Sequence, residues 1–188
     1  MTKTYASRYD EWADKIMQHV DVPDGLLGSS YHNDLCPSVM TKPIGKGDWY
    51  VQLFIDYPDV ADREDPDSDP YTVYVMSDDG DHYHHTTDVS GCALTAVLGY
   101  RFALTIREGL TDGEWTAMRA EARQLAADGV TNVCPSHDYC DANVALLDAF
   151  TSIYGPLPDD RRITDEAHVE MDKAHDFAFT HIFAAEEV

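Results

Sequence analysis

The spacing of apolar residues changes along this chain, and the changes divide it into segments. An apolar residue recurs every three or four positions from about residue 5 to residue 20, which predicts an amphipathic helix. We expect irregular structure from 26 to 48, where three glycines and two prolines interrupt any period. The helical stripe consists of Tyr5, Tyr9, Trp12, Ile16 and Val20.

An alternating pattern follows and predicts three β-strands, at about 49–57, 71–76 and 82–89. The connection 77–81 contains an Asp-Gly step, which is a strong hairpin signal between two such runs. The sequence therefore predicts a three-stranded antiparallel meander. Its first strand buries one face, formed by Trp49, Val51, Leu53, Ile55 and Tyr57.

The helical period returns after residue 90 and continues to the end of the chain. It predicts four helices, since capping and terminating residues divide the segment into four parts. We expect one α+β domain spanning 1–188, with an N-terminal helix, the meander, and four C-terminal helices packed on one sheet face. The helix signals are Ser90 and Gly109, then Thr111 with Glu114 and Gly129, then Asp138 and Gly155, and last Thr164.

A formal charge of −22 adds a surface property to this fold, because 35 acidic residues face only 13 basic ones. Burying an unpaired carboxylate is very costly, so most of these groups must lie on the surface. Such a surface repels nucleic acid and anionic membranes and favours cationic partners. A role in solubility alone, or adaptation to a salty habitat, explains the same charge.

The N-terminal residues and the apolar runs bear on localisation. No apolar run approaches the roughly 18 residues that cross a bilayer. The first ten residues have mixed charge and no apolar stretch follows them, unlike a signal peptide. We therefore expect a cytoplasmic protein with reduced cysteines.

The densest acidic segments are the two connections of the predicted meander, and we take them as a candidate interaction surface. Asp65 to Asp69 alternate as in a calcium-binding loop, but Pro70 stands where the turn glycine belongs and Met76 where the bidentate glutamate belongs. This pattern excludes a calcium sensor. The candidate surface consists of Asp62, Glu64, Asp65, Asp67, Asp69, Asp78, Asp79 and Asp81.

Cys134, His137 and Cys140 form the best candidate metal site. Two thiolates and an imidazole within seven residues supply three of the four ligands that tetrahedral zinc requires. Cys36, Cys92 or a histidine of the third strand would have to supply the fourth. The alternative is a helix start, with Asp138 as the cap and Cys140 as a small core residue. Apart from zinc, no cofactor is indicated.

The remaining residues do not specify an enzyme. Alternation places His82 and His84 on one face of the third strand, where they could hold a metal or a phosphate or simply face solvent. The sequence contains no Gly-x-Ser-x-Gly, no phosphate-binding Gly-Lys loop, no glycine-rich dinucleotide motif and no His-Glu-x-x-His. We therefore assign no catalytic residue and favour a non-enzymatic role.

Two segments resemble known groups of proteins. Residues 136–143, Ser-His-Asp-Tyr-Cys-Asp-Ala-Asn, and the apolar helix that ends near Phe150 resemble a stretch in small uncharacterised phage and prophage proteins. The Asp-rich, lysine-poor composition is similar to that of actinobacteriophage proteins. Residues 49–104 resemble antirestriction proteins of the ArdB/KlcA type. These resemblances imply a phage or plasmid origin and carry over no functional residue.

These observations favour an accessory protein, encoded by a phage, that binds a cationic or DNA-binding host protein in the host cytoplasm. A DNA mimic or counter-defence factor is one form of that role, because dense carboxylates can occupy a groove built for DNA. One alternative is a zinc-stabilised domain or metal-dependent enzyme built on Cys134, His137 and Cys140. Another is a self-assembling structural protein.

Overall fold

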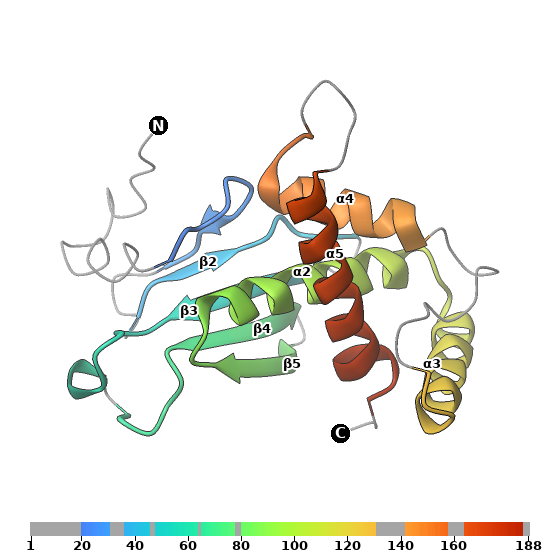
Figure 1. The fold of residues 1–188 in the computed structure, drawn as a ribbon, viewed down its shortest axis with the longest axis horizontal. Helices are drawn as coiled ribbons and strands as arrows, with labels where there is room; N and C mark the ends of the chain where they lie inside the picture. Colours follow the sequence, from blue (N-terminus) through green and yellow to red (C-terminus); the bar gives the residue numbers. More distant parts are fainter. Residues whose placement is uncertain are drawn as a thin grey trace.

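A computed structural model describes residues 20–30, 36–45, 48–63, 65–77, 80–130, 142–157 and 164–185, and only the backbone of Asp81. Within these ranges an antiparallel sheet of five strands is covered on one face by helices (Figure 1). The α+β class predicted from the sequence is confirmed. The predicted N-terminal helix lies outside the described residues apart from Val20, which is buried at a bend.

The predicted meander is present as β3 (Tyr50–Ile55), β4 (Tyr71–Ser77) and β5 (Gly80–Thr87). Burial alternates along β3 and β4, as the period-two pattern requires, and the buried side chains face the helices. Ser77 pairs with Gly80, so the hairpin connection is shorter than the 77–81 segment expected from the sequence.

Two further strands, β1 (Leu27–Gly28) and β2 (Ser38–Met40), extend the sheet in the order β1-β2-β3-β4-β5. The prediction of three strands and irregular structure at 26–48 was wrong on this point. Strands of two and three residues are too short to show a period, and β2 is held by its neighbours. The Ser38 N–H donates to Ser30 Oγ, and the Val51 N–H donates to Thr41 Oγ1.

Four α-helices follow β5, as predicted, with bounds close to those expected. They are α2 (Ser90–Glu108), α3 (Asp112–Ala127), α4 (Ala142–Tyr154) and α5 (Asp165–Ala178), which continues as a π-helix, η3 (Phe179–Phe183). Thr111 and Thr164 are N-caps with side-chain hydrogen bonds, as predicted. Ser90 is instead the first helical residue, after Val89, while Asp138 lies outside the described residues.

The helices form two layers, which corrects the expectation that all four pack on the sheet. α2 contacts β3, β4 and β5, whereas α4 and α5 pack on α2, and α3 contacts η3 (Figure 1). Every residue of α2 from Ala96 to Leu104 is buried, so this helix has no solvent face along that stretch. Apart from Arg101, this stretch is apolar or aromatic on all sides and must be covered on all sides, and the second layer supplies that cover. None of the helices in the described ranges is both long and apolar enough to cross a bilayer.

Candidate functional site

The predicted zinc ligands Cys134, His137 and Cys140 lie outside the described residues. Within the described ranges, the structure brings together no group of three or more histidine, cysteine, aspartate or glutamate side chains that could hold a metal ion. The zinc hypothesis therefore remains a prediction.

The two histidines expected to share a face of β5 lie on opposite faces. The register of the β4–β5 pair shifts between Val75 and Met76, because Val75 pairs with Tyr83 while Met76 pairs with Asp81. His82 is thus the extra residue of a β-bulge, and its ring lies 4.3 Å from that of Trp49, on the side of the helices. The His84 ring stacks on Tyr74 at 6.1 Å, on the other face.

Five of the eight residues of the predicted interaction surface belong to one loop, the β3–β4 connection at residues 59–69, which we call the acidic loop. Asp62, Asp65 and Asp67 are exposed there, and Asp69 ends the loop beside β4. The backbone is locally ordered, because Asp59 caps the short helix η2 (Val60–Asp62) and the Asp65 carboxylate accepts from the Asp67 N–H. The side chains of Glu64, Asp78, Asp79 and Asp81 lie outside the described residues.

Arg63 holds the two ends of the acidic loop together. Its guanidinium donates to three main-chain carbonyls: Nε to Tyr57 at 2.6 Å, Nη1 to Ser68 at 2.6 Å and Nη2 to Pro58 at 3.0 Å. The cation is thus directed at the backbone of the loop, and no described ion pair joins it to a loop carboxylate. Arg63 therefore links the two ends of the loop, and the described aspartates Asp62, Asp65, Asp67 and Asp69 are exposed on it.

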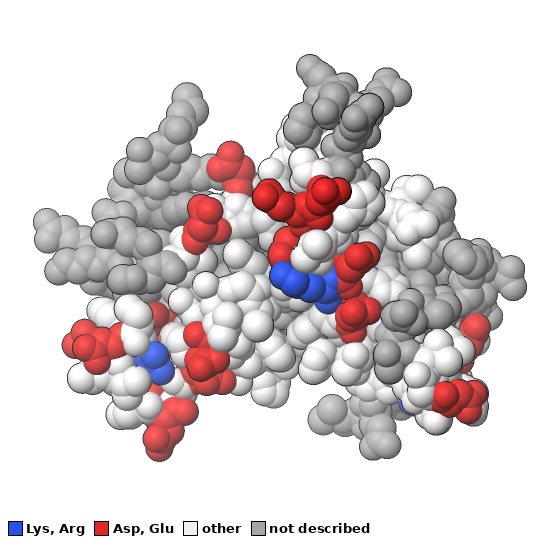
Figure 2. Space-filling view, in the orientation of Figure 1, with Lys and Arg blue, Asp and Glu red and all other residues white. Residues whose placement is uncertain are grey.

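Two further arginines are used inside the fold. Arg101 and Arg119 are buried and donate to the carbonyls of Lys42 and Ala185. Burial lowers the pKa of Arg101, although Asp148 acts in the opposite direction. Both cations thus support the backbone of the fold. Figure 2 shows acidic side chains over the loop, at lower left, and over α5, near the centre, with neutral surface between the two groups.

His85 of β5 lies between the acidic loop and the end of the last helix. Its ring is 5.1 Å from Phe177 and 5.4 Å from His181, measured between centroids. Burial lowers the pKa of His85, and His181 and His84 lower it further, while Asp69 raises it. The opposing effect of Asp69 places the negative charge at the end of the loop within electrostatic reach of β5.

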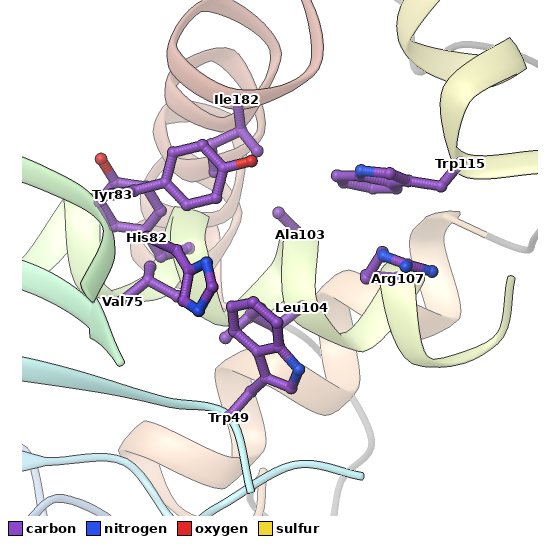
Figure 3. A pocket seen from close by; sticks show the side chains of 10 residues that line it. Trp49, Val75, His82, Tyr83, Ala103, Leu104, Arg107, Trp115 and Ile182 are labelled. Atoms are coloured by element: carbon purple, nitrogen blue, oxygen red, sulfur yellow. The ribbon is translucent and has the colours of Figure 1, made fainter. Parts of the chain in front are cut away.

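A second candidate site is a pocket of about 180 Å³ between the sheet and the helices, which the sequence analysis did not identify. Its aromatic walls come from segments far apart in the chain, with Trp49 before β3, Tyr83 on β5, Tyr100 on α2 and Trp115 on α3. Trp49, His82 and Tyr83 face Trp115 and Arg107 across the space (Figure 3). Burial and the neighbouring Tyr83 raise the pKa of Tyr100 to about 12, so its hydroxyl remains protonated at neutral pH.

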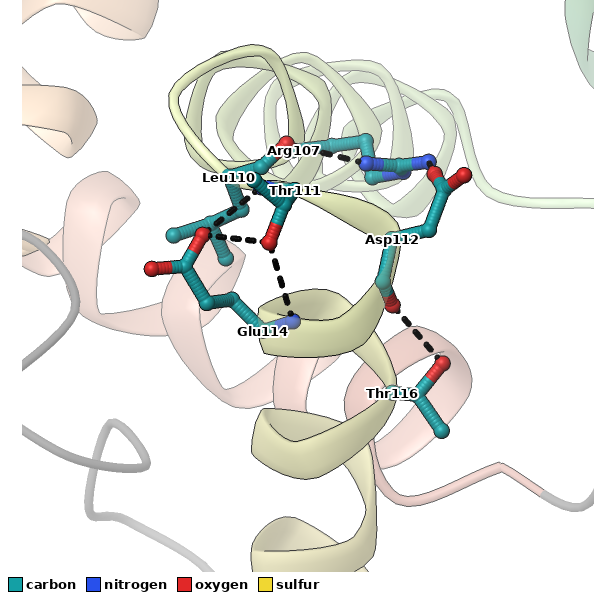
Figure 4. A network of polar contacts seen from close by, with 6 residues as sticks. All are labelled: Arg107, Leu110, Thr111, Asp112, Glu114 and Thr116. Atoms are coloured by element: carbon teal, nitrogen blue, oxygen red, sulfur yellow. Dashed lines mark hydrogen bonds and ion pairs between the residues drawn. The ribbon is translucent and has the colours of Figure 1, made fainter.

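The α2–α3 junction positions Arg107 (Figure 4), and through it one side of the Trp115 ring. Arg107 Nη1 donates to the Leu110 carbonyl at 3.2 Å, Nη2 pairs with Asp112, and the guanidinium lies 5.6 Å from the centroid of the Trp115 ring. A capping box then starts α3, because the Thr111 and Glu114 side chains each bond to the other's backbone N–H. The start of α3 therefore determines where one wall of the pocket lies.

Thr111→Ala should lower the free energy of unfolding by about 1 kcal/mol, because it removes the N-cap and half of the box. Thr116→Ala is the matched control, since the Thr116 hydroxyl only donates a hydrogen bond to the Asp112 carbonyl within the same helix. Urea denaturation followed by circular dichroism measures both. Equal losses in the two variants would contradict the assignment of Thr111 as the residue that fixes the start of α3.

Comparison of this chain with protein-family models, curated protein sequences and solved structures finds no match, so the likeness to phage and antirestriction proteins remains a prediction.

Proposed function

We propose that this chain is a non-enzymatic accessory protein that binds a cationic protein, with the acidic loop as its main contact surface. The observation that carries the proposal is the use of Arg63, whose guanidinium links the two ends of the loop through three backbone carbonyls and makes no described ion pair with a loop carboxylate. A surface held in one conformation loses less entropy on binding than a flexible one. The loop is therefore suited to recognition as well as to solubility.

The sign of the charge supports a protein partner over nucleic acid or membrane. A chain of net charge −22 repels phosphates at long range and accelerates its encounter with a positive surface. Charges at the rim of an interface act mainly on the association rate and on its salt dependence. Binding that weakens steeply with salt is accordingly part of the proposal.

The biological setting that we propose is counter-defence by a phage-encoded protein, in which the partner is a DNA-binding or DNA-processing protein of the host. In its DNA-mimic form, the carboxylates would follow duplex phosphates, which present about one charge every 1.7 Å of axis. The acids in Figure 2 lie in separate groups instead. That distribution favours a partner with discrete cationic patches, and competition with duplex DNA tests the mimic form.

The immobilised chain, exposed to bacterial cell extract at low salt, should retain a protein rich in lysine and arginine, and about 0.3 M salt should release it. A variant in which four aspartates of the acidic loop become asparagines, which we call the loop variant, should weaken this binding by roughly tenfold or more. It removes four rim charges and keeps each hydrogen-bond acceptor. Mass spectrometry identifies the partner, and titration with the purified partner gives the affinities. The loop variant carries Asp62→Asn, Asp65→Asn, Asp67→Asn and Asp69→Asn.

A second variant, with the same net charge as the loop variant, separates the effect of the loop on binding from the effect of the overall charge. Its four substitutions lie at exposed positions outside the acidic loop, and it should bind the partner within about twofold of the unaltered chain. Equal weakening in both variants, or retention of no basic protein at low salt, would refute the proposal. The control carries Asp21→Asn, Asp48→Asn, Glu121→Gln and Asp128→Asn.

A further inference from the structure

We infer that the pocket between Trp49 and Trp115 is a binding site for a small planar molecule with one aromatic ring and a hydrogen-bond acceptor directed at Arg107. The pocket and the acidic loop lie at opposite ends of the strands. Trp49 precedes β3 and Val75 is near the end of β4, whereas the loop follows β3 and precedes β4. The site therefore goes beyond the proposed function and can be tested separately.

The size of the pocket sets the size of the ligand. The pocket volume of about 180 Å³ is slightly larger than that of an engineered apolar protein cavity of about 150 Å³ that binds benzene. One six-membered ring with a small substituent fits such a space, whereas a nucleoside is too large for it. Ala103 contributes only a methyl group to the lining, so a larger side chain at that position would fill the space (Figure 3).

The walls of the pocket select a flat ligand. Trp49 and Trp115 bring large aromatic faces from opposite sides, and Tyr83 and Tyr100 are themselves stacked at 6.1 Å. Aromatic rings gain energy from each other through offset stacking and edge-to-face contacts, in addition to the area that they bury. A saturated ring of the same volume makes neither contact. Planarity is therefore expected to matter more than apolar volume alone.

Arg107 determines the polar end of the ligand. Its guanidinium already lies over the Trp115 ring, so a cationic ligand would meet a like charge in the position that an ammonium group would take. The guanidinium has five N–H donors, and only two described bonds occupy them, to Leu110 and Asp112. The remaining donors suit a carbonyl or carboxylate oxygen.

The test uses benzamide and benzoate as rings with an acceptor, toluene as a ring without one, and cyclohexanecarboxamide as an acceptor without a planar ring. Ligand-observed NMR measures binding, and tryptophan fluorescence reports on the pocket, because Trp49 and Trp115 are two of the three tryptophans in the chain. We expect benzamide or benzoate to bind at least roughly tenfold more tightly than cyclohexanecarboxamide. Whichever of the two binds more tightly identifies the acceptor as neutral or charged.

Two variants distinguish this pocket from nonspecific binding. Ala103→Leu fills the cavity and should weaken benzamide and benzoate binding roughly tenfold or more, whereas Ala117→Leu, at an exposed position on α3, should leave both unchanged. Arg107→Gln should weaken the two acceptor probes and leave toluene unaffected. Because toluene binding also requires a folded pocket, it controls for damage to the structure.

Three results would overturn the inference: no binding of any aromatic probe at millimolar concentration, equal binding to the Ala103→Leu and Ala117→Leu proteins, or equal affinity for planar and saturated rings. The loop variant should bind the probes with the same affinity as the unaltered chain. Failure of the partner-binding experiment would thus leave this inference standing, and failure of the probe experiment would leave the proposed function standing.

Discussion

Gly99→Ala is expected to destabilise the protein by about 2 kcal/mol or more, even though alanine favours a helix more than glycine does. Gly99 lies in the fully buried part of α2, where α5 packs against it. A Cβ atom at this position would lie 2.6 Å from Phe177 Cδ1 and 2.9 Å from the Ala174 carbonyl oxygen. The second of these is a backbone atom, so relief requires the two helices to move apart.

Gly91→Ala is the matched control for Gly99→Ala, because it makes the same substitution in the first turn of the same helix. Nothing lies within 4 Å of a Cβ atom at Gly91. Helix propensity then acts alone and should stabilise the protein by up to about 1 kcal/mol. Urea denaturation of the two variants compares them directly. If Gly99→Ala is as stable as Gly91→Ala, the close approach of α2 and α5 is not a feature of the folded protein.

The importance of Gly99 illustrates what the sequence predicts and what it does not. Local signals were sufficient for the capping box of Thr111 and Glu114 and for the alternation along β3 and β4, because these depend on neighbouring residues. The closeness of Gly99 to Ala174 depends on how α5 crosses α2, and no local pattern encodes a crossing. The short strands β1 and β2 were missed for a similar reason, since each is defined by its pairing, β1 with β2 and β2 with β3.

The candidate sites also combine features that the local sequence predicts with features that only the folded chain creates. The position of the acidic loop follows from composition, because its aspartates lie close together in the sequence. The role of Arg63 could not be predicted, since its acceptors are backbone carbonyls, which every residue has. The pocket was missed because Trp49 and Trp115 fit the apolar faces of separate elements. The contact of His82 with Trp49 likewise depends on the bulge beside Val75, which local alternation does not predict.

Raising the salt concentration from about 10 mM to about 150 mM should raise the melting temperature by roughly 5 °C, which corresponds to about 2 kcal/mol. The Debye length falls from about 30 Å to about 8 Å over this range, so repulsion among exposed acids across the molecule is screened. Arg63, Arg101 and Arg119 donate to backbone carbonyls, whereas Arg107 pairs with Asp112. Scanning calorimetry measures the melting temperature. A flat or falling trend would mean that bound cations or local pairing already neutralise the acids.

Two single substitutions on α5 separate this long-range repulsion from local effects, since each removes one negative charge from the same helix. Asp165 is in the first turn of α5, where the helix dipole favours an acid. Asp176 lies well before Phe183, where the continuous α5–η3 helix ends, so the dipole has little effect on it. Asp165→Asn should therefore lower the free energy of unfolding by about 0.5 kcal/mol relative to Asp176→Asn at low salt. Both variants should show a smaller salt-dependent rise in melting temperature than the unaltered chain, because both reduce the net charge. If only one of them changes the salt response, the repulsion is local to one end of α5 and does not arise from the whole acidic surface.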